Sequence, residues 1–239
     1  MTTPSTKQII SGDSFILDKF KDIAPGSDRH CLNVSILCDS IAKVIESINA
    51  DNLIAAARLH DIGKCNNPMY FSENQDSDSN IHDELDPPVS FQYISRHIAD
   101  GVMKLTQLGV DPDIIKIISE HHGDSIVGGI YNKAKKKYNG STMEEHYRYK
   151  STKPSSVESC ILMIVDVIES ACRSLSNSGK LDDVKSIVER LINDLIDDEQ
   201  LDVLTIGQIR LIKKVLLKEV ESIYHKRVSY EDEEEKDEK

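Results

Sequence analysis

The sequence predicts an all-α fold, and three observations support this prediction. The apolar content comes from Ile, Leu, Val and Ala, because aromatic residues make up only 5% of the 239 residues and Trp is absent. Apolar residues recur at helical spacing along most of the chain. No segment alternates apolar and polar residues as a half-buried strand does. A chain of this length buries a substantial core, so we expect one main helical domain with short appendages.

The first 25 residues are predicted to be an appendage. Residues 1–12 form a loose leader rich in Thr and Ser, and a short helix follows over about 14–23. The run Pro25-Gly26-Ser27-Asp28 then breaks the chain, and Ser27 or Asp28 is suited to cap the next helix. That helix has apolar residues at helical spacing, at Val34, Leu37, Ile41, Ile45 and Ile48. The main domain is therefore expected over residues 26–230.

Three more helices are predicted in the middle of the chain. One runs from Asp51, as its N-cap, to about Ile62 and ends at Gly63. The polar stretch 65–88 is long for a loop in a compact domain, so we expect it to be functional or mobile. The next helix begins after Pro87-Pro88 and runs to Gln107. The third begins at Asp111-Pro112, a cap followed by Pro at the first helical position, and is ended by Gly123.

The C-terminal part is predicted to contain three helices and a disordered end. Residues 132–155 look irregular and carry two basic clusters. A long apolar helix is expected over about 156–175, followed by two amphipathic helices over about 181–196 and 205–224. These two helices are candidates for a homodimer face. Residues 231–239, EDEEEKDEK, form a low-complexity acidic tail that we expect to be disordered.

Charge and cysteine content exclude several classes of protein. The net charge of −12 argues against duplex nucleic acid as a partner, which needs a positive surface. Bound metals can still supply local positive charge for a small phosphorylated ligand. The five cysteines form no C-x-x-C pair and no secretory signal is present, so we expect reduced thiols in a cytoplasmic protein. No apolar run approaches the ~20 residues that span a bilayer.

Seven potential metal ligands stand on five of the predicted helices, in the order H…HD…H…HH…D. They are His30, His60, Asp61, His97, His121, His122 and Asp166. Imidazole and carboxylate suit iron, manganese or zinc. A carboxylate has two oxygens, so an adjacent His-Asp pair can serve two ions. Such a centre makes hydroxide from water and clamps a phosphate, which predicts a metal-dependent phosphohydrolase.

The alternative is that these side chains have structural roles and bind no metal, because a single His on an apolar helical face is usually structural. Asp166 argues against this, because it falls inside the apolar run 161–168, where an unpaired carboxylate is expensive to bury. The adjacent pairs His60-Asp61 and His121-His122 each close a helix and can point into one cleft. The joint pattern therefore favours a metal site.

The ordered motifs resemble those of a known family. The set comprises His60-Asp-Ile-Gly-Lys64, Pro68-x-x-Phe71-x-Glu73-Asn74-Gln75, Ser95-x-His97-x-x-Asp100-Gly101, Glu120-His-His-Gly123, Tyr147-Arg148-Tyr149 and Asp166-x-x-Glu169-x-x-x-Arg173. They resemble the HD superfamily of metal-dependent phosphohydrolases. The residues around the metal-ligand motifs are similar to those in the HD domain of seven-transmembrane HD phosphodiesterases that hydrolyse cyclic di-AMP. The resemblance covers roughly residues 26–230 and implies an HD-domain helical bundle.

The resemblance also implies two divalent metal ions, most simply iron or manganese. One would be held by His30, His60, Asp61 and Asp166. The other would be held by His97, His121 and His122, with Asp61 bridging. Two details depart from the family: Arg29 replaces a His, and Lys150-Ser151-Thr152 replaces Pro-Gly-Pro. The family's membrane helices are absent from this sequence, so an excised domain and a free-standing enzyme both remain open.

The implied reaction is hydrolysis of cyclic di-AMP to pApA by a hydroxide activated between the metals. Three alternatives stay open: another cyclic di- or oligonucleotide as substrate, a nucleotide monophosphatase or dNTPase, and a binding module that senses a cyclic nucleotide without cleaving it. The last is disfavoured by the complete ligand set.

Seven further residues are candidates beside the metal ligands. Lys64 is expected either to place positive charge beside the phosphate or to be a solvated lysine after a helix end. Glu73 and Asn74 meet a base edge. His82 positions substrate, or caps its loop. Arg148 and Lys153 close over the ligand, or belong to a solvated basic loop. Arg173 binds the second phosphate, or pairs with Glu169, which we favour slightly.

Overall fold

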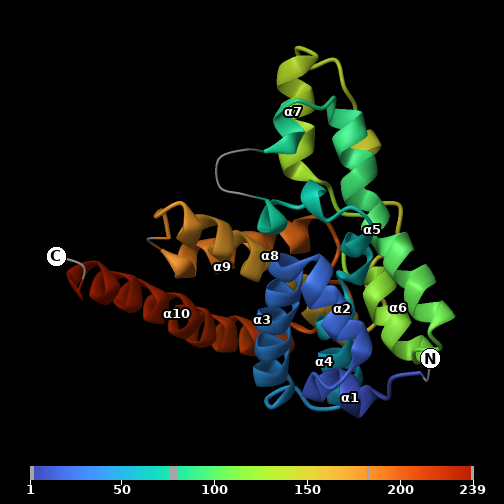
Figure 1. The fold of residues 1–239 in the computed structure, drawn as a ribbon. Coiled ribbons are helices and arrows are strands. Elements are labelled where there is room, and N and C mark those ends of the chain that lie inside the picture. Colours follow the sequence, from blue (N-terminus) through green and yellow to red (C-terminus); the bar gives the residue numbers. More distant parts are fainter. Residues whose placement is uncertain (1–2, 76–79, 182, 238–239) are drawn as a thin grey trace.

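The structure is a computed structural model that describes residues 3–75, 80–181 and 183–237 (Figure 1). In these ranges the chain is all-α, which confirms the predicted fold class, and its nearest approach to β structure is an isolated bridge between Ile126 and Arg148. The α-helices are α1 (Thr6–Ser11), α2 (Phe15–Ile23), α3 (Pro25–Ala42), α4 (Ala50–Leu59), α5 (Pro87–Gln107), α6 (Pro112–Glu120), α7 (Gly128–Lys137), α8 (Val157–Asn177), α9 (Val184–Asp197) and α10 (Ile206–Asp237). Short 3-10 helices are η1 (Ile62–Asn66), η2 (Pro68–Tyr70), η3 (Ser72–Asn74), η4 (Ile81–Asp83) and η5 (Glu144–Tyr147).

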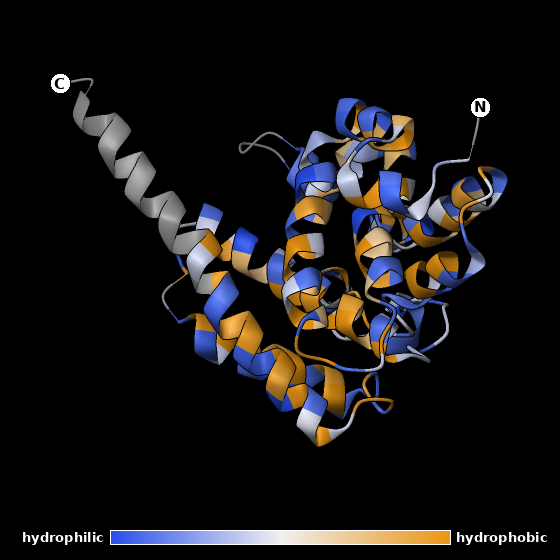
Figure 2. Ribbon diagram, turned by 90° about the horizontal axis from the view of Figure 1, so that it is seen from below, coloured by the Kyte–Doolittle hydropathy of each residue, from blue (hydrophilic) through white to orange (hydrophobic). Residues whose placement is uncertain are grey.

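The core lies where α3, α4, α6 and α8 meet. Helix α3 packs on α4 and α8, and both α4 and α8 pack on α6. Every residue of α8 from Ser159 to Asp166 is buried, and so is the run 55–57 of α4, whose three alanines allow neighbouring helices to come close. Apolar residues gather on the helix faces that meet each other, and polar residues lie outside (Figure 2). Each fully buried Leu or Ile contributes about 1.5–3 kcal/mol to this core.

The N-terminal segment is more ordered than the sequence suggests. Part of the expected loose leader forms α1, which begins with a capping box between Ser5 and Gln8. Helix α1 buries Ile9 and packs on α4. Helix α3 starts at Pro25, which takes the first helical position, so Ser27 and Asp28 lie inside the helix and do not cap it. The cap comes instead from a distant residue, described below.

Other boundaries also differ from the prediction. Helix α3 ends at Ala42, although the apolar pattern continues to Ile48, and α4 is capped by Asn49. The predicted N-cap and first position of α6, Asp111 and Pro112, are confirmed. Helix α10 runs from Ile206 to Asp237, and the disordered acidic tail expected over residues 231–239 stays a prediction.

The stretch 132–155, predicted to be irregular, overlaps the helix α7, which begins before it at Gly128. Its buried residues, Ile130 and Ala134, join Tyr147 in a small second core against the start of α5, so α7 and α5 form an arm beside the main bundle (Figure 1). The polar stretch 65–88 is a chain of 3-10 turns, and its residues 76–79 lie outside the described part. All five cysteines are free. No helix in the described ranges is both long and apolar enough to cross a bilayer.

Candidate metal centre

All seven predicted ligands converge on one place in the bundle. Helix α3 carries His30, α5 carries His97 and α8 carries Asp166, while the ends of α4 and α6 carry the pairs His60-Asp61 and His121-His122. Their nitrogen and oxygen atoms form three overlapping groups, each suited to hold a metal ion: His30/His60/Asp61, His60/His121/Asp166 and His97/His121/His122. Five helices therefore contribute to one centre, and six of the seven side chains are buried.

The turn after the His-Asp pair makes this convergence possible. Gly63 lies directly against α5, and a Cβ at Gly63 would stand 1.9 Å from the backbone oxygen of His97. Only a residue without a side chain allows this approach. The motif glycine therefore brings Asp61 close to His97.

One side of the centre is formed by His30, His60 and the two carboxylates. His30 Nε2 lies 2.9 Å from Asp166 Oδ1 and 3.6 Å from Asp61 Oδ2. His60 Nε2 lies 3.4 Å from Asp61 Oδ2 and 3.7 Å from Asp166 Oδ1. These atoms surround a space that one cation can share.

The other side is formed by the remaining three imidazoles. His97 Nε2 lies 3.4 Å from His121 Nε2 and 3.5 Å from Asp61 Oδ1, and His122 Nδ1 lies 3.6 Å from Asp166 Oδ2. The two oxygens of Asp61 thus face different sides of the centre. Asp61 would therefore be able to contribute one oxygen to an ion on each side.

Local hydrogen bonds fix the direction of the imidazoles. Nδ1 of His60, His97 and His121 each meets the carbonyl oxygen three residues earlier, at 2.9, 2.6 and 2.5 Å. Since a carbonyl only accepts, the proton sits on Nδ1 and the lone pair of Nε2 points into the centre. His30 Nδ1 is oriented differently, by the carboxylate of Glu169 from α8.

A buried atom without a partner indicates what the centre holds. His60 is fully buried, and its Nε2 has no hydrogen-bond partner among the described residues. Buried polar atoms are almost always satisfied. A divalent cation would satisfy this nitrogen, and the nitrogen-rich, thiolate-free ligand set fits such an ion.

The pKa values of most of these side chains favour the protonation states that bind a cation. Burial lowers the pKa of His122 to about 3 and holds that of His121 well below its usual value, so both keep a lone pair at neutral pH. Burial opposes the charge on Asp61, but Lys64 and the surrounding imidazoles outweigh it and hold the Asp61 pKa well below its usual range. His30 and His60 are the exceptions. Asp166 and Glu169 outweigh burial and raise the pKa of His30 to about 10, and Cys31, Asp61 and Asp166 outweigh burial and raise the pKa of His60 well above its usual value. A cation binding beside His30 would displace that proton.

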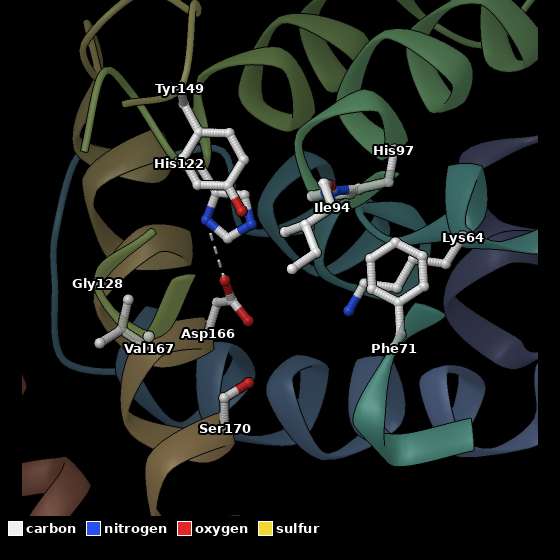
Figure 3. A pocket seen from close by; sticks show the side chains of 11 residues that line it. Lys64, Phe71, Ile94, His97, His122, Gly128, Tyr149, Asp166, Val167 and Ser170 are labelled. Atoms are coloured by element: carbon white, nitrogen blue, oxygen red, sulfur yellow. Dashed lines mark hydrogen bonds and ion pairs between the residues drawn. The ribbon is translucent and has the colours of Figure 1, made fainter. Parts of the chain in front are cut away.

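A pocket of about 490 Å³ opens in front of the centre (Figure 3). This volume suits a drug-sized or nucleotide-sized ligand. The residues that line it are Lys64, Phe71, Ile94, His97, His122, Gly128, Gly129, Tyr149, Asp166, Val167 and Ser170. Three of the candidate metal ligands, His97, His122 and Asp166, thus form part of the pocket wall, where a substrate can reach them.

Among the predicted substrate contacts, Lys64 alone lines this pocket. Its Nζ lies 2.7 Å from both Asp61 Oδ2 and Glu73 Oε1, and it sits over the ring of Phe71. Glu73 also accepts a hydrogen bond from Ser27 Oγ at 2.8 Å. The solvated alternative for Lys64 is therefore wrong, since the ammonium is held between two buried carboxylates.

Asn74 acts as the missing cap of α3. Its Oδ1 accepts hydrogen bonds from the backbone N–H groups of Gly26 at 2.9 Å and Ser27 at 3.2 Å. Its amide group donates to Ser27 Oγ at 2.8 Å. The contact with a base edge stays a prediction for Asn74 and Glu73, and both already have protein partners.

The other candidate contacts lie away from the pocket wall. Arg148 pairs with Glu144 and Asp198 and donates to Asp124 O, and Lys153 pairs with Glu199. His82 Nε2 donates to Tyr70 O at 2.7 Å. Arg173 lies 3.4 Å from Glu169, the structural pair that the sequence slightly favoured. The substrate roles of Arg148, Lys153, His82 and Arg173 stay predictions.

Sequence reasoning missed several pocket residues. Tyr149 stacks on His122 with ring centroids 4.4 Å apart, and Phe71 packs edge-on against His97. Gly128 and Gly129 come from the unpredicted helix α7, and Ser170 lies one turn after Asp166. The motifs contain Phe71 and Tyr149, but nothing local shows that they face the metal ligands.

Comparisons with known proteins agree with this geometry. Residues 28–171 match the HD domain family. The chain is 33% identical over 219 residues to the cyclic-di-AMP phosphodiesterase PgpH of Bacillus subtilis (strain 168), which is 90% of this chain and 30% of that protein. It is 33% identical over 236 residues to PgpH of Listeria monocytogenes, covering 97% of this chain and 32% of that protein. The chain thus spans about a third of the length of these relatives.

Two solved structures share the fold. The crystal structure of the L. monocytogenes phosphodiesterase PgpH HD domain superposes with a TM-score of 0.80 at 32% identity, covering 88% of this chain and 99% of that chain. The same domain in complex with cyclic-di-AMP gives a TM-score of 0.81 at 33% identity, covering 88% and 98%.

Proposed function

The chain belongs to the HD domain family, and we propose that it is a metal-dependent phosphodiesterase that hydrolyses cyclic di-AMP to pApA. One observation carries the proposal: Asp61 faces two groups of imidazoles at once, and its neighbours His97, His122 and Asp166 line a pocket large enough for a cyclic dinucleotide. The choice of cyclic di-AMP is supported by the similar proteins and by the similar domain whose structure contains it.

We assign one ion to His30, His60, Asp61 and Asp166 and the other to His97, His121 and His122, with iron or manganese as the preferred metals. When bound by these residues, two such ions would supply a hydroxide near neutral pH and would neutralise the oxygens of the phosphate. The protein keeps the Nε2 atoms of His60, His97 and His121 aimed inward through their Nδ1–H bonds. Fixed ligands of this kind need no rearrangement during the reaction.

Lys64 adds a positioned positive charge at the pocket wall. Asp61 and Glu73 hold its ammonium group and keep its pKa above its usual value despite burial, so it stays protonated at neutral pH. We assign it the role of attracting the phosphate toward Asp61 and its neighbours. A buried charge that is already paired does this without moving.

The proposal is tested by incubating the protein with cyclic di-AMP and Mn²⁺ and separating the products by chromatography. We expect pApA, and no product from His60→Ala. Intact cyclic di-AMP bound after long incubation would indicate a binding module. Cleavage of cyclic di-GMP or another cyclic oligonucleotide in its place would reassign the substrate, and release of inorganic phosphate or triphosphate from nucleotides would indicate a monophosphatase or dNTPase.

A further inference from the structure

The first turn of α7 has free hydrogen-bond donors. Helix α7 begins after Val127, and no side chain caps it. The N–H of Tyr131 bonds to Val127 O at 3.0 Å, but those of Gly128, Gly129 and Ile130 have no acceptor among the described residues. Free donors at a helix N-terminus, together with the helix dipole, attract an anion.

These donors face the pocket in front of the metal ligands. Gly128 and Gly129 line it together with Val167 and Ser170 from α8. In Figure 3, Gly128 and Val167 lie on one side of Asp166 and His122, and Lys64 and Phe71 lie on the opposite side. The pocket therefore has positive charge or donors at both ends and the metal ligands between them.

Tyr149 provides an independent sign of a ligand at this end. Its side chain is stacked on His122, and only 7% of the residue is exposed. Its hydroxyl points into the pocket (Figure 3) and has no hydrogen-bond partner in the described ranges. The polar atom of a residue buried to this extent normally has a partner, and a ligand in the pocket would supply one to this hydroxyl.

The two glycines leave space that no atom of the described residues fills. A Cβ at Gly128 or Gly129 would meet nothing within 4 Å, whereas a Cβ at Gly63 would meet backbone. Neither residue has a positive φ, so the backbone does not require glycine there. What their missing side chains provide is access to the free N–H groups from the pocket.

We propose that the N-terminus of α7 and the hydroxyl of Tyr149 bind the second phosphate of the cyclic dinucleotide, while the phosphate to be cleaved lies at the metal ligands. This subsite rests on the proposed function and deepens it. A cyclic dinucleotide carries two phosphodiesters, and a pocket with two anion sites selects it over a substrate with one.

The test compares two substrates and a matched pair of glycines. Gly129 and Gly207 are each the second residue of a helix, and neither has a positive φ. Gly129→Val fills the proposed subsite, and Gly207→Val is the control in α10. Tyr149→Phe keeps the ring on His122 and removes only the hydroxyl. The substrates are cyclic di-AMP and bis(4-nitrophenyl) phosphate, a diester with a single phosphate.

We expect Gly129→Val and Tyr149→Phe to raise KM for cyclic di-AMP by about tenfold, the typical effect of losing hydrogen bonds to a charged group. Turnover of the one-phosphate diester, metal content and Tm should stay as in the wild type, and Gly207→Val should change neither substrate. An unchanged KM for cyclic di-AMP, or equal losses on both substrates, would overturn the subsite. Wild-type protein that cleaves the diester but not cyclic di-AMP would instead refute the proposed function.

Discussion

Asp61 is the residue on which the two halves of the centre depend, since its Oδ1 faces His97 and its Oδ2 faces His30 and His60. Asp61→Asn keeps the shape and removes the charge. We expect activity to fall by at least about a hundredfold. Even the loss of a residue that only hydrogen-bonds to a metal ligand typically lowers metal affinity or activity 10–100-fold. Metal content, measured by mass spectrometry, should drop below two ions per chain. The control is Asp39→Asn on the exposed face of α3, and equal activity of the two variants would contradict the bridging role.

Glu73 links stability to pH through Lys64. Burial opposes its charge, but Lys64 outweighs burial and lowers the Glu73 pKa to about 2. The folded-state pKa is below the unfolded one, so the stabilisation is complete above about pH 4.5 and is lost as the pH falls toward 2. Glu73→Gln should therefore reduce the free energy of unfolding by roughly 3–5 kcal/mol at pH 7. In urea unfolding the gap to the wild type should narrow below pH 4.5, and a gap independent of pH would refute this account.

The sequence indicated the residues that converge in the candidate metal centre but not the partners of the surrounding charged groups. His60-Asp61 and His121-His122 stand out because two chelating groups are adjacent. The partners of Arg148 and Asn74 are not adjacent: Asp198 is 50 residues from Arg148, and Ser27 is 47 residues from Asn74. An isolated polar residue can pair with any such group, so its function is decided only by the tertiary fold.

At the scale of elements, helix caps connect stability to the centre. Asn74 caps α3, which carries His30, and Asn49 caps α4 by accepting from Asn52 N–H at 3.1 Å. Asn74→Ala and Asn49→Ala should each lower the free energy of unfolding by about 1 kcal/mol in urea. Asn74→Ala should also lower kcat/KM several-fold, because the cap tethers η3 and Glu73 to α3. If Asn49→Ala reduced kcat/KM as much, the effect would be one of stability alone.

The predicted elements were most accurate where a strong local signal marks them. Asp111-Pro112 correctly marked the start of α6. Pro87-Pro88 marked the start of α5, which begins at the first of these two prolines. Helix α7 was missed because two glycines and a run of lysines hide its short apolar face, which is stable only against Tyr147 and the start of α5. Helix α1 was missed for a similar reason, since a single buried Ile9 anchors it on α4.

At the scale of the whole molecule, the ligands tie together five helices, so metal binding and folding are coupled. An ion that binds only the folded state adds about 4 kcal/mol at a thousand times its Kd. Removing metal with EDTA should therefore lower Tm by about 8–16 °C, and Mn²⁺ should restore it, as measured by circular dichroism. His60→Ala should respond far less to EDTA. A Tm that is insensitive to chelation in the wild type would argue against ions held across these helices.

The homodimer expected from the C-terminal helices stays a prediction. Ile196, Val203, Ile206 and Leu211 are exposed around the junction of α9 and α10. Sedimentation equilibrium should give twice the chain mass if this face pairs, and Leu211→Glu should then return the mass to that of one chain. A wild-type protein with the mass of one chain at high concentration would exclude the dimer.

The imidazoles differ in when their alignment arises as the chain folds. His60, His97 and His121 take their direction from a carbonyl within their own turn, so each ring is set as soon as its helix forms. His30 takes its direction from Glu169, 139 residues further along the chain, and is set only when α3 docks on α8. A partly unfolded molecule that has lost this docking would keep the side of the centre formed by His97, His121 and His122. It would lose the side to which His30 belongs. Nucleotide cleavage would then cease before the last metal ion dissociates.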